Sequence, residues 1–139
     1  MNIYIKIFKF IIYSFFLIQI EIAFAKTKSI GSFKNWNAYI STIENKKTCF
    51  LASEPSQSIG KYDRKNRGKT YVFITNIKGS TMHEVSVVAG FNYKKNSKVL
   101  FNIDGKKTKM FPVDDRAWSE STKIDRSLVR LMKKGKKLT

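Results

Sequence analysis

Most of the chain consists of short stretches in which apolar and polar side chains alternate, or in which β-branched and aromatic residues gather. Five such stretches follow the first 25 residues: 36–41, 47–53, 70–75, 85–89 and 99–103. An alternation of period two places one set of side chains on each face of a strand. The second stretch is closed by Glu54-Pro55, because proline has no N–H for a sheet ladder. The pattern predicts five strands, with 70–75 as a central one.

A tight hairpin is predicted at Asp104-Gly105. This pair follows the strand-like run 99–103 and precedes a further run at 108–111. Both central positions of such a turn need a positive φ, which aspartate and glycine tolerate. By contrast, residues 56–69 are polar, contain glycine and carry several cations, so we expect a long loop there.

One helix is predicted at the end of the chain. Its apolar stripe, with spacings i, i+4, i+7 and i+8, is Ile124, Leu128, Leu131 and Met132. Thr122 and Asp125 have the spacing of a capping box, and Gly135 suits the residue after the last turn. A basic amphipathic helix can lie on a membrane. We expect this one to pack on the sheet instead, because the sheet needs a cover.

These elements predict a mainly β fold, an antiparallel β-sandwich or roll with a C-terminal α-helix. Residues 26–139 contain no repeat, linker or low-complexity tract that would divide them. Their number suffices for one small domain and not for two. We therefore expect 26–139 to form a single β-rich domain.

The first 25 residues have the three parts of a secretory signal peptide. Lys6 and Lys9 precede a short apolar run at 10–20, and Ala23 and Ala25 are small residues two apart. We expect a signal helix that is cleaved after Ala25, which places the remainder in the periplasm, at the cell surface or outside the cell. The alternative is an uncleaved anchor, although a spanning helix needs about 20 apolar residues.

The chain is strongly basic, with 27 lysine and arginine residues, 10 acidic residues and a formal net charge of +17. This balance suggests either a solvated basic surface or binding to anionic lipid or polysaccharide. Nucleic acid is a less suitable partner, because lysines far outnumber arginines, whose planar fork recognises phosphates and bases. The lysines are also spread along the chain rather than gathered in one block.

Few residues could carry nucleophilic catalysis. Cys49 and His83 are the only cysteine and the only histidine, so a thiol–imidazole pair would need both. A Cys49-dependent enzyme is therefore a remote alternative. The lone thiol excludes an intramolecular disulfide, and we expect Cys49 to be a buried small hydrophobe or to pair with another molecule.

The sequence also lacks the residue patterns of a carboxylate-pair active site, a metal site and a phosphate-binding loop. Asp114 and Asp115 are adjacent, so they would point to opposite sides of an extended chain, and we expect them to shape the turn before 116–118. The spacings of histidine, cysteine and acidic residues match no zinc or calcium site, and no glycine-rich phosphate loop is present. The sequence predicts no catalytic residue, metal or cofactor.

The one local cluster of charge lies in the predicted loop. The candidate patch for an anion or a partner is Arg64, Lys65, Arg67 and Lys69. Four cations in six residues could bind a phosphate or sulfate group. The alternative is a solvated loop in which Arg67 or Arg64 pairs with the edge of the sheet.

Aromatic residues occur along the whole predicted domain. Those considered as core residues are Trp36, Phe73, Phe91, Tyr93, Phe101, Phe111 and Trp118. Single-stranded nucleic acid is bound on exposed aromatic platforms. The spacing of these residues is instead typical of core positions, and we expect them to be buried.

Six stretches in a fixed order carry a likeness to known proteins: Phe33-x-x-Trp36, Cys49-Phe-Leu-Ala-Ser-Glu-Pro55, Arg67-Gly-Lys-Thr-Tyr71, Glu84-Val-Ser-Val-Val-Ala-Gly-Phe91, Asp115-Arg-Ala-Trp118 and Leu128-Val-Arg-Leu-Met-Lys-Lys-Gly135. Together the stretches resemble the invasion-associated locus B family over nearly all of 33–138. The resemblance implies a small exported, mostly β protein of alphaproteobacteria without a known catalytic site. In pathogenic members it implies an association with entry into host cells.

The chain departs from that family at its end. Family members continue beyond the helix with a strand, another helix and a late cysteine, whereas this chain stops at Leu138-Thr139. The resemblance therefore implies a shortened member, in which Cys49 lacks a partner thiol and the sheet either has an open edge or is completed differently.

The sequence as a whole predicts an exported, non-catalytic protein that binds a protein or an envelope component, with host-cell interaction as one setting. The alternative is a cationic binder of anionic lipid, polysaccharide or nucleic acid. The oligomeric state does not follow from these patterns.

Overall fold

The computed structural model describes residues 27–43, 45–77 and 82–139, which form eight strands and one helix. The strands are β1 (Lys28–Phe33), β2 (Trp36–Ile43), β3 (Lys46–Ser53), β4 (Tyr71–Ile77), β5 (His83–Val88), β6 (Val99–Ile103), β7 (Lys106–Val113) and β8 (Arg116–Trp118), and the helix is α2 (Thr122–Lys134). The predicted signal peptide and its cleavage position at Ala25 lie outside the described residues.

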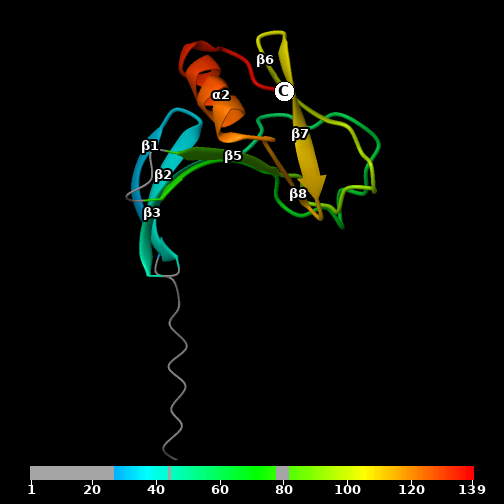
Figure 1. Ribbon diagram of the computed structural model, residues 1–139. Helices are drawn as coiled ribbons and strands as arrows, with labels where there is room; N and C mark the ends of the chain where they lie inside the picture. The colour runs from blue at the N-terminus through cyan, green and yellow to red at the C-terminus, as the bar shows by residue number, and fades with distance from the viewer. Residues whose placement is uncertain (1–26, 44, 78–81) are drawn as a thin grey trace, which may run out of the picture.

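All eight strands belong to one antiparallel sheet with the order β1-β2-β3-β4-β5-β8-β7-β6. The first five strands follow one another as a meander, and β8 then pairs with β5 on its other side. In Figure 1 the helix lies above β5, between β1–β3 and the β6–β7 hairpin. The prediction of a mainly β, antiparallel fold with a C-terminal helix is confirmed. A sandwich, one of the two forms expected for this fold, needs two packed sheets. The described residues form a single sheet.

The five predicted strands correspond to β2–β6, and β4 is indeed flanked on both sides. The Asp104-Gly105 hairpin is confirmed, with φ values of 48° and 90° at its two residues. Asp114, with φ 51°, forms the predicted turn between β7 and β8. Two strands were not predicted, because β1 has no clear alternation and β8 is only three residues long.

The core lies between one face of the sheet and α2. Its buried members are Val85, Phe101, Ile103, Met110, Ala117 and Leu128. Leu128 is the buried centre of the predicted helical stripe, and the other three residues of the stripe pack against the core. The prediction that the helix covers the sheet is therefore confirmed.

The start of α2 differs from the predicted capping box. The N-cap residue is Ser121, whose hydroxyl accepts a hydrogen bond from the backbone N–H of Ile124 (3.4 Å). The carboxylate of Asp125 does not return to the helix start but accepts a hydrogen bond from the backbone N–H of Val85 on β5 (2.8 Å). Strand β8 ends at Trp118, and the carbonyl of Val85 still accepts from Ser119 (3.4 Å). Asp125 thus supplies the acceptor that a longer β8 would have given, because a buried N–H needs a partner.

The outer edge of β6 is closed by the last residues of the chain. Asn102 exchanges two backbone hydrogen bonds with Thr139 (2.7 and 2.9 Å), and Ile103 forms a β-bridge with Leu138. The carboxylate of Asp104 also accepts hydrogen bonds from the backbone N–H groups of Lys136 and Lys137, each 2.9 Å long. The open edge that was expected at the end of the chain is therefore not found at β6.

Gly135 ends the helix for a steric reason. Its φ of −76° is accessible to any residue, and its N–H bonds to the carbonyl of Leu131. A Cβ at this position would lie 2.6 Å from Cγ2 of the buried Ile103. Glycine is needed here because the helix end approaches β6 closely.

We expect Asp125→Ala to lower the free energy of unfolding by about 1–3 kcal/mol, the cost of leaving a buried backbone N–H without a partner. Asp125→Asn keeps a side-chain oxygen as acceptor and should lose less. Urea denaturation measures both, with Ser127→Ala, on the exposed side of the helix, as the control. If Asp125→Ala were no more damaging than Ser127→Ala, the bond to Val85 would not be what secures the helix.

The pKa of Asp104 is lowered because its carboxylate accepts hydrogen bonds from the backbone of Lys136 and, next, of Lys137. A carboxyl group whose pKa is lower in the folded chain stabilises the fold above its unfolded pKa, and this contribution is lost as the pH falls through the folded pKa. Asp104→Asn keeps the turn conformation but not the charge. We therefore expect the wild type to exceed Asp104→Asn in stability near neutral pH, and the difference to shrink below about pH 4. A difference that stays constant in acid would contradict this role.

Candidate binding sites

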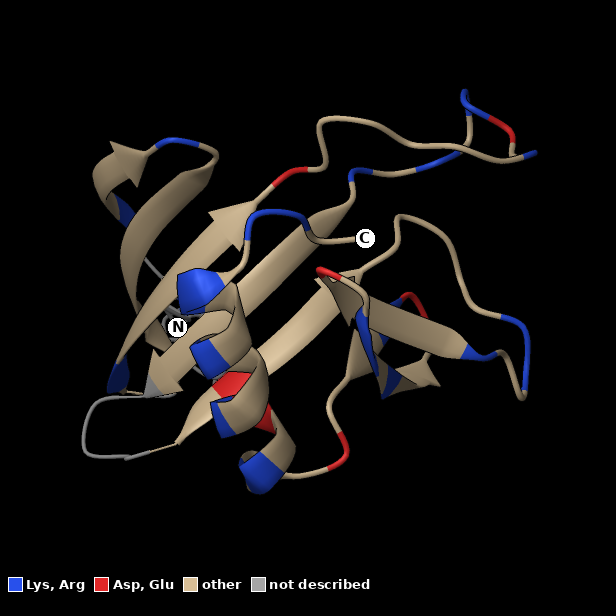
Figure 2. Cartoon of the chain, turned by 90° about the horizontal axis from the view of Figure 1, so that it is seen from above, with Lys and Arg blue, Asp and Glu red and all other residues tan. Residues whose placement is uncertain are grey.

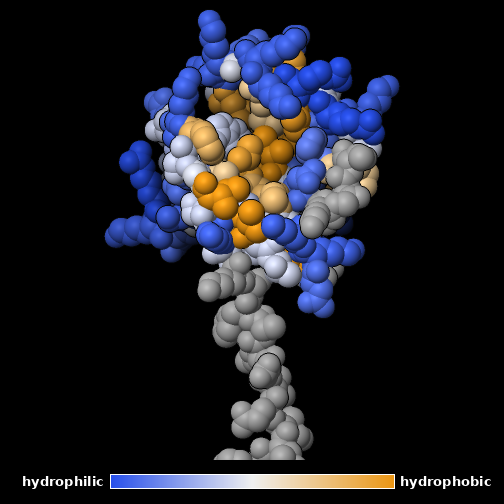
Figure 3. All heavy atoms as spheres, turned by 90° about the vertical axis from the view of Figure 1, so that its left-hand side faces the viewer, coloured by the Kyte–Doolittle hydropathy of each residue, from blue (hydrophilic) through white to orange (hydrophobic). Residues whose placement is uncertain are grey.

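An apolar groove lies between the helix and the first strands of the sheet. It has a volume of about 360 Å³. Its lining from the sheet includes Ile30, Trp36, Ala38, Cys49, Leu51, Ile74, Asn76 and His83, and its lining from α2 is Val129, Met132 and Lys133. Figure 3 shows an apolar area ringed by hydrophilic residues on the side of the molecule where β1–β3 lie.

The register of the sheet explains why this groove exists. Ala38, Leu51, Ile74 and Val85 are successive partners across β2, β3, β4 and β5, so their side chains share one face. Val85 is fully buried in the core with Leu128 of the helix, whereas Leu51 is 36% exposed. The apolar face of the sheet therefore continues beyond the part that the helix covers, and the groove is this uncovered continuation.

A second row on the same face carries the polar groups of the groove. Cys49, Asn76 and His83 are partners across β3, β4 and β5. The side-chain amide nitrogen of Asn76 lies 3.2 Å from Nδ1 of His83. Cys49 is a free thiol and only half-buried, so of the two expectations for it, burial is met only in part.

Cys49 and His83, which a Cys49-dependent enzyme would need as a pair, are separated in this row by Asn76. Neighbouring strands are about 4.8 Å apart, so the backbones of Cys49 and His83, with β4 between them, are about 10 Å apart. A nucleophile and its base need hydrogen-bond contact. The structure brings Cys49 and His83 into one groove, but Asn76 stands between them and bonds to the imidazole.

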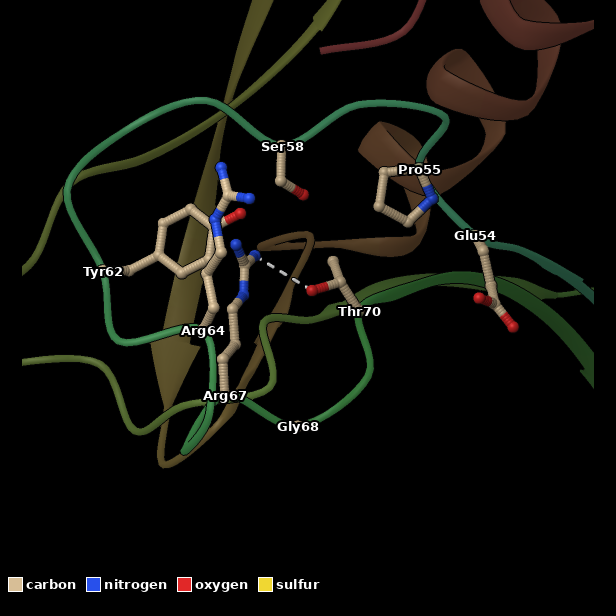
Figure 4. Close-up of a pocket in the computed structure, with 8 residues that line it drawn as sticks. All are labelled: Glu54, Pro55, Ser58, Tyr62, Arg64, Arg67, Gly68 and Thr70. Atoms are coloured by element: carbon tan, nitrogen blue, oxygen red, sulfur yellow. Dashed lines mark hydrogen bonds between the residues drawn. The ribbon is translucent and has the colours of Figure 1, made fainter.

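A second pocket, of about 430 Å³, is formed by the loop between β3 and β4. Figure 4 shows its lining residues: Glu54, Pro55, Ser58, Tyr62, Arg64, Arg67, Gly68 and Thr70. The carboxylate of Asp63 organises the loop nearby, because it accepts hydrogen bonds from the backbone N–H of Lys65 (2.9 Å) and from the amide of Asn66 (2.6 Å). These two bonds, in that order, lower the pKa of Asp63.

Arg67 ties this loop to the end of β5. Its Nε donates to the carbonyl of Ala89 (3.1 Å), and its Nη2 donates to the hydroxyl of Thr70 (2.9 Å). The guanidinium also lies 4.5 Å from the ring centre of Tyr62 and 5.4 Å from that of Phe91. Arg67 thus has the structural role that the sequence offered as the alternative to anion binding.

The four cations of the predicted patch do not form one cluster of equivalent groups. Arg67 is held by the fold, and the ammonium of Lys69 lies 3.8 Å from the carboxylate of Glu54 with both side chains exposed. Lys65 is exposed and lies outside the pocket lining, which includes Arg64. Arg64 is therefore the cation of this patch best placed to meet a ligand in the pocket.

The expectation that the aromatic residues are buried is wrong for most of them. Phe101 lies in the core and Tyr93 packs against it, but Phe91 and Phe111 are 46% and 58% exposed. Phe73 and Trp118 lie on the face that the helix does not cover, where the guanidinium of Arg116 is 5.3 and 5.9 Å from their rings. These side chains shield one another instead of filling the core.

Among the described residues, no three histidine, cysteine or acidic side chains are grouped to hold a metal ion. In the same ranges, no helix is long and apolar enough to cross a bilayer. No protein-family model, curated protein or solved structure matches this chain. The resemblance to the invasion-associated locus B family therefore stays a prediction.

We expect Arg67→Ala to destabilise the fold by about 1–3 kcal/mol, because the charge-assisted hydrogen bonds from Arg67 to the carbonyl of Ala89 and to the hydroxyl of Thr70 are lost, although Thr70 still donates to Ala89. Arg64→Ala removes the same charge from the same pocket and should change stability by less than about 0.5 kcal/mol. Thermal and urea unfolding of the two variants measures the difference. Equal losses would mean that Arg67 does not tie the loop to the sheet.

Proposed function

We propose that this protein is an exported, non-catalytic binding protein that holds a protein or envelope component in its apolar groove. The observation that supports the proposal is the row from Val85 to Leu51, whose apolar side chains pass from the core to the surface within one sheet face. Soluble proteins seldom leave a contiguous apolar area uncovered unless it binds something.

Export is the second part of the proposal. The charged start, the short apolar run and Ala23 and Ala25 support a signal peptide that is cleaved after Ala25. The product would work in the periplasm, at the cell surface or outside the cell. The resemblance to invasion-associated locus B proteins adds host-cell interaction as a setting in which such binding could act.

A second candidate function is binding of anionic lipid, polysaccharide or nucleic acid by the cationic surface. The formal net charge is +17, and the ion pairs found among the described residues are two exposed ones, Lys69–Glu54 and Lys109–Glu120. Figure 2 shows lysine and arginine along the helix and the loops, with few acidic residues between them. Binding of this kind weakens steeply with salt, whereas contact with an apolar groove does not.

We expect Leu51→Lys to reduce retention of the protein on envelope preparations about tenfold or more, because a charge would be placed in the groove. Leu100→Lys makes the same change at an exposed leucine of β6, outside the groove, and should leave retention within twofold of the wild type. Sedimentation with envelope fractions at low and high salt measures both variants.

Equal retention of the two variants at every salt concentration would contradict the groove as the binding site. If the wild-type protein loses its retention in high salt, the cationic surface is the favoured binding site instead of the groove.

A further inference from the structure

We propose that the ligand of the apolar groove is a single-chain anionic amphiphile, with its alkyl chain along the groove and its anionic head at Lys133. This inference rests on the proposed function and names the chemical class of its envelope component. It assigns the groove a small-molecule ligand rather than a protein surface.

The dimensions and lining of the groove fit a small ligand with an apolar body. Its volume of about 360 Å³ lies near the lower end of the range for small-molecule sites. Such sites are mostly apolar and carry a few polar groups that orient the ligand. Here the apolar walls include Leu51, Ile74 and Met132, and an alkyl chain between the sheet and the helix would cover them.

The polar groups indicate the charge of the ligand. Asn76 and His83 bond to each other, which leaves Lys133 as the charged group of the lining. Neither of the ion pairs found in the described ranges involves Lys133. An ammonium group beside an apolar groove attracts an anionic head, and the net charge of +17 acts in the same direction.

Two other occupants fit less well. A second copy of the chain would bring another strongly positive surface, and like charges oppose such an association. An extended peptide could pair with the edge of β1, but the register of β1 shifts between Ser29 and Gly31. A bulge of this kind interrupts the ladder and discourages strand addition.

Cys49 gives a direct readout of occupancy, because it is the only cysteine of the chain and lines the groove. We expect dodecanoate, below its micelle concentration, to slow alkylation of Cys49 by uncharged N-ethylmaleimide at least tenfold. The affinity of the groove for the carboxylate should rise up to about fifteenfold from octanoate to decanoate, and by the same factor from decanoate to dodecanoate. Each step adds two methylenes, and each buried methylene raises the affinity about fourfold. Dodecyltrimethylammonium should protect at least tenfold less well at the same concentration. Far-UV circular dichroism shows that the fold is kept throughout.

Two neighbouring lysines provide a matched pair of variants. Lys133→Glu should weaken dodecanoate binding at least tenfold, because the head would meet a like charge. Lys134→Glu makes the same charge change one residue on, outside the groove lining, and should weaken it less than twofold. Both substitutions lie in the last turn of α2, so their effects on helix stability are similar.

The proposal is overturned if the cationic amphiphile protects Cys49 as well as dodecanoate does, or if the two lysine variants behave alike. It is also overturned if anionic vesicles bind while monomeric dodecanoate gives no protection, because the surface would then recognise a membrane. If dodecanoate does not protect Cys49 but Leu51→Lys still reduces envelope retention, the amphiphile is overturned as the ligand. The groove would then bind a protein partner. Failure of both experiments would overturn the proposed function as well.

Discussion

The hydrogen bond between the carboxylate of Asp125 and the backbone N–H of Val85 determines where the helix sits on the sheet. The N–H lies next to the point where β8 ends, so without the carboxylate it would be buried and unpaired. Asp125 is also in the first turn of α2, where a negative charge is favoured by the helix dipole. The helix is thereby fixed over β5, and its single apolar stripe covers the centre of the sheet. The apolar rows on β2 and β3 extend past it, and this leaves the groove.

The features that the sequence allowed us to predict depend on neighbours in the chain. The Asp104-Gly105 turn follows from the φ values that these two residues tolerate, and the helical stripe follows from its own spacing. The partner of Asp125 could not be found in this way, because Val85 lies 40 residues away and a local capping box used the same aspartate. The role of Arg67 was open for the same reason, since its acceptor on Ala89 is 22 residues distant.

The groove and the aromatic face were missed because alternation does not say which face of a strand is covered. Leu51 follows the expected pattern, yet it is 36% exposed because the helix does not reach across β3. Similarly, Phe73 and Trp118 alternate as core residues would, but the single helix lies on the other face. A second sheet packed on that other face would have covered Phe73 and Trp118, so their position outside the core and the single sheet of the described residues have one cause.

The two margins of the sheet are not equivalent. On one side, Thr139 already exchanges two backbone hydrogen bonds with Asn102 of β6, and Leu138 forms a bridge with Ile103. On the other, β1 is paired with β2 alone among the described residues. A fibre built by strand addition needs every copy to offer two free margins, one for each neighbour. Strand addition at β6 would first have to displace Thr139 from Asn102, which disfavours growth of a fibre through the sheet.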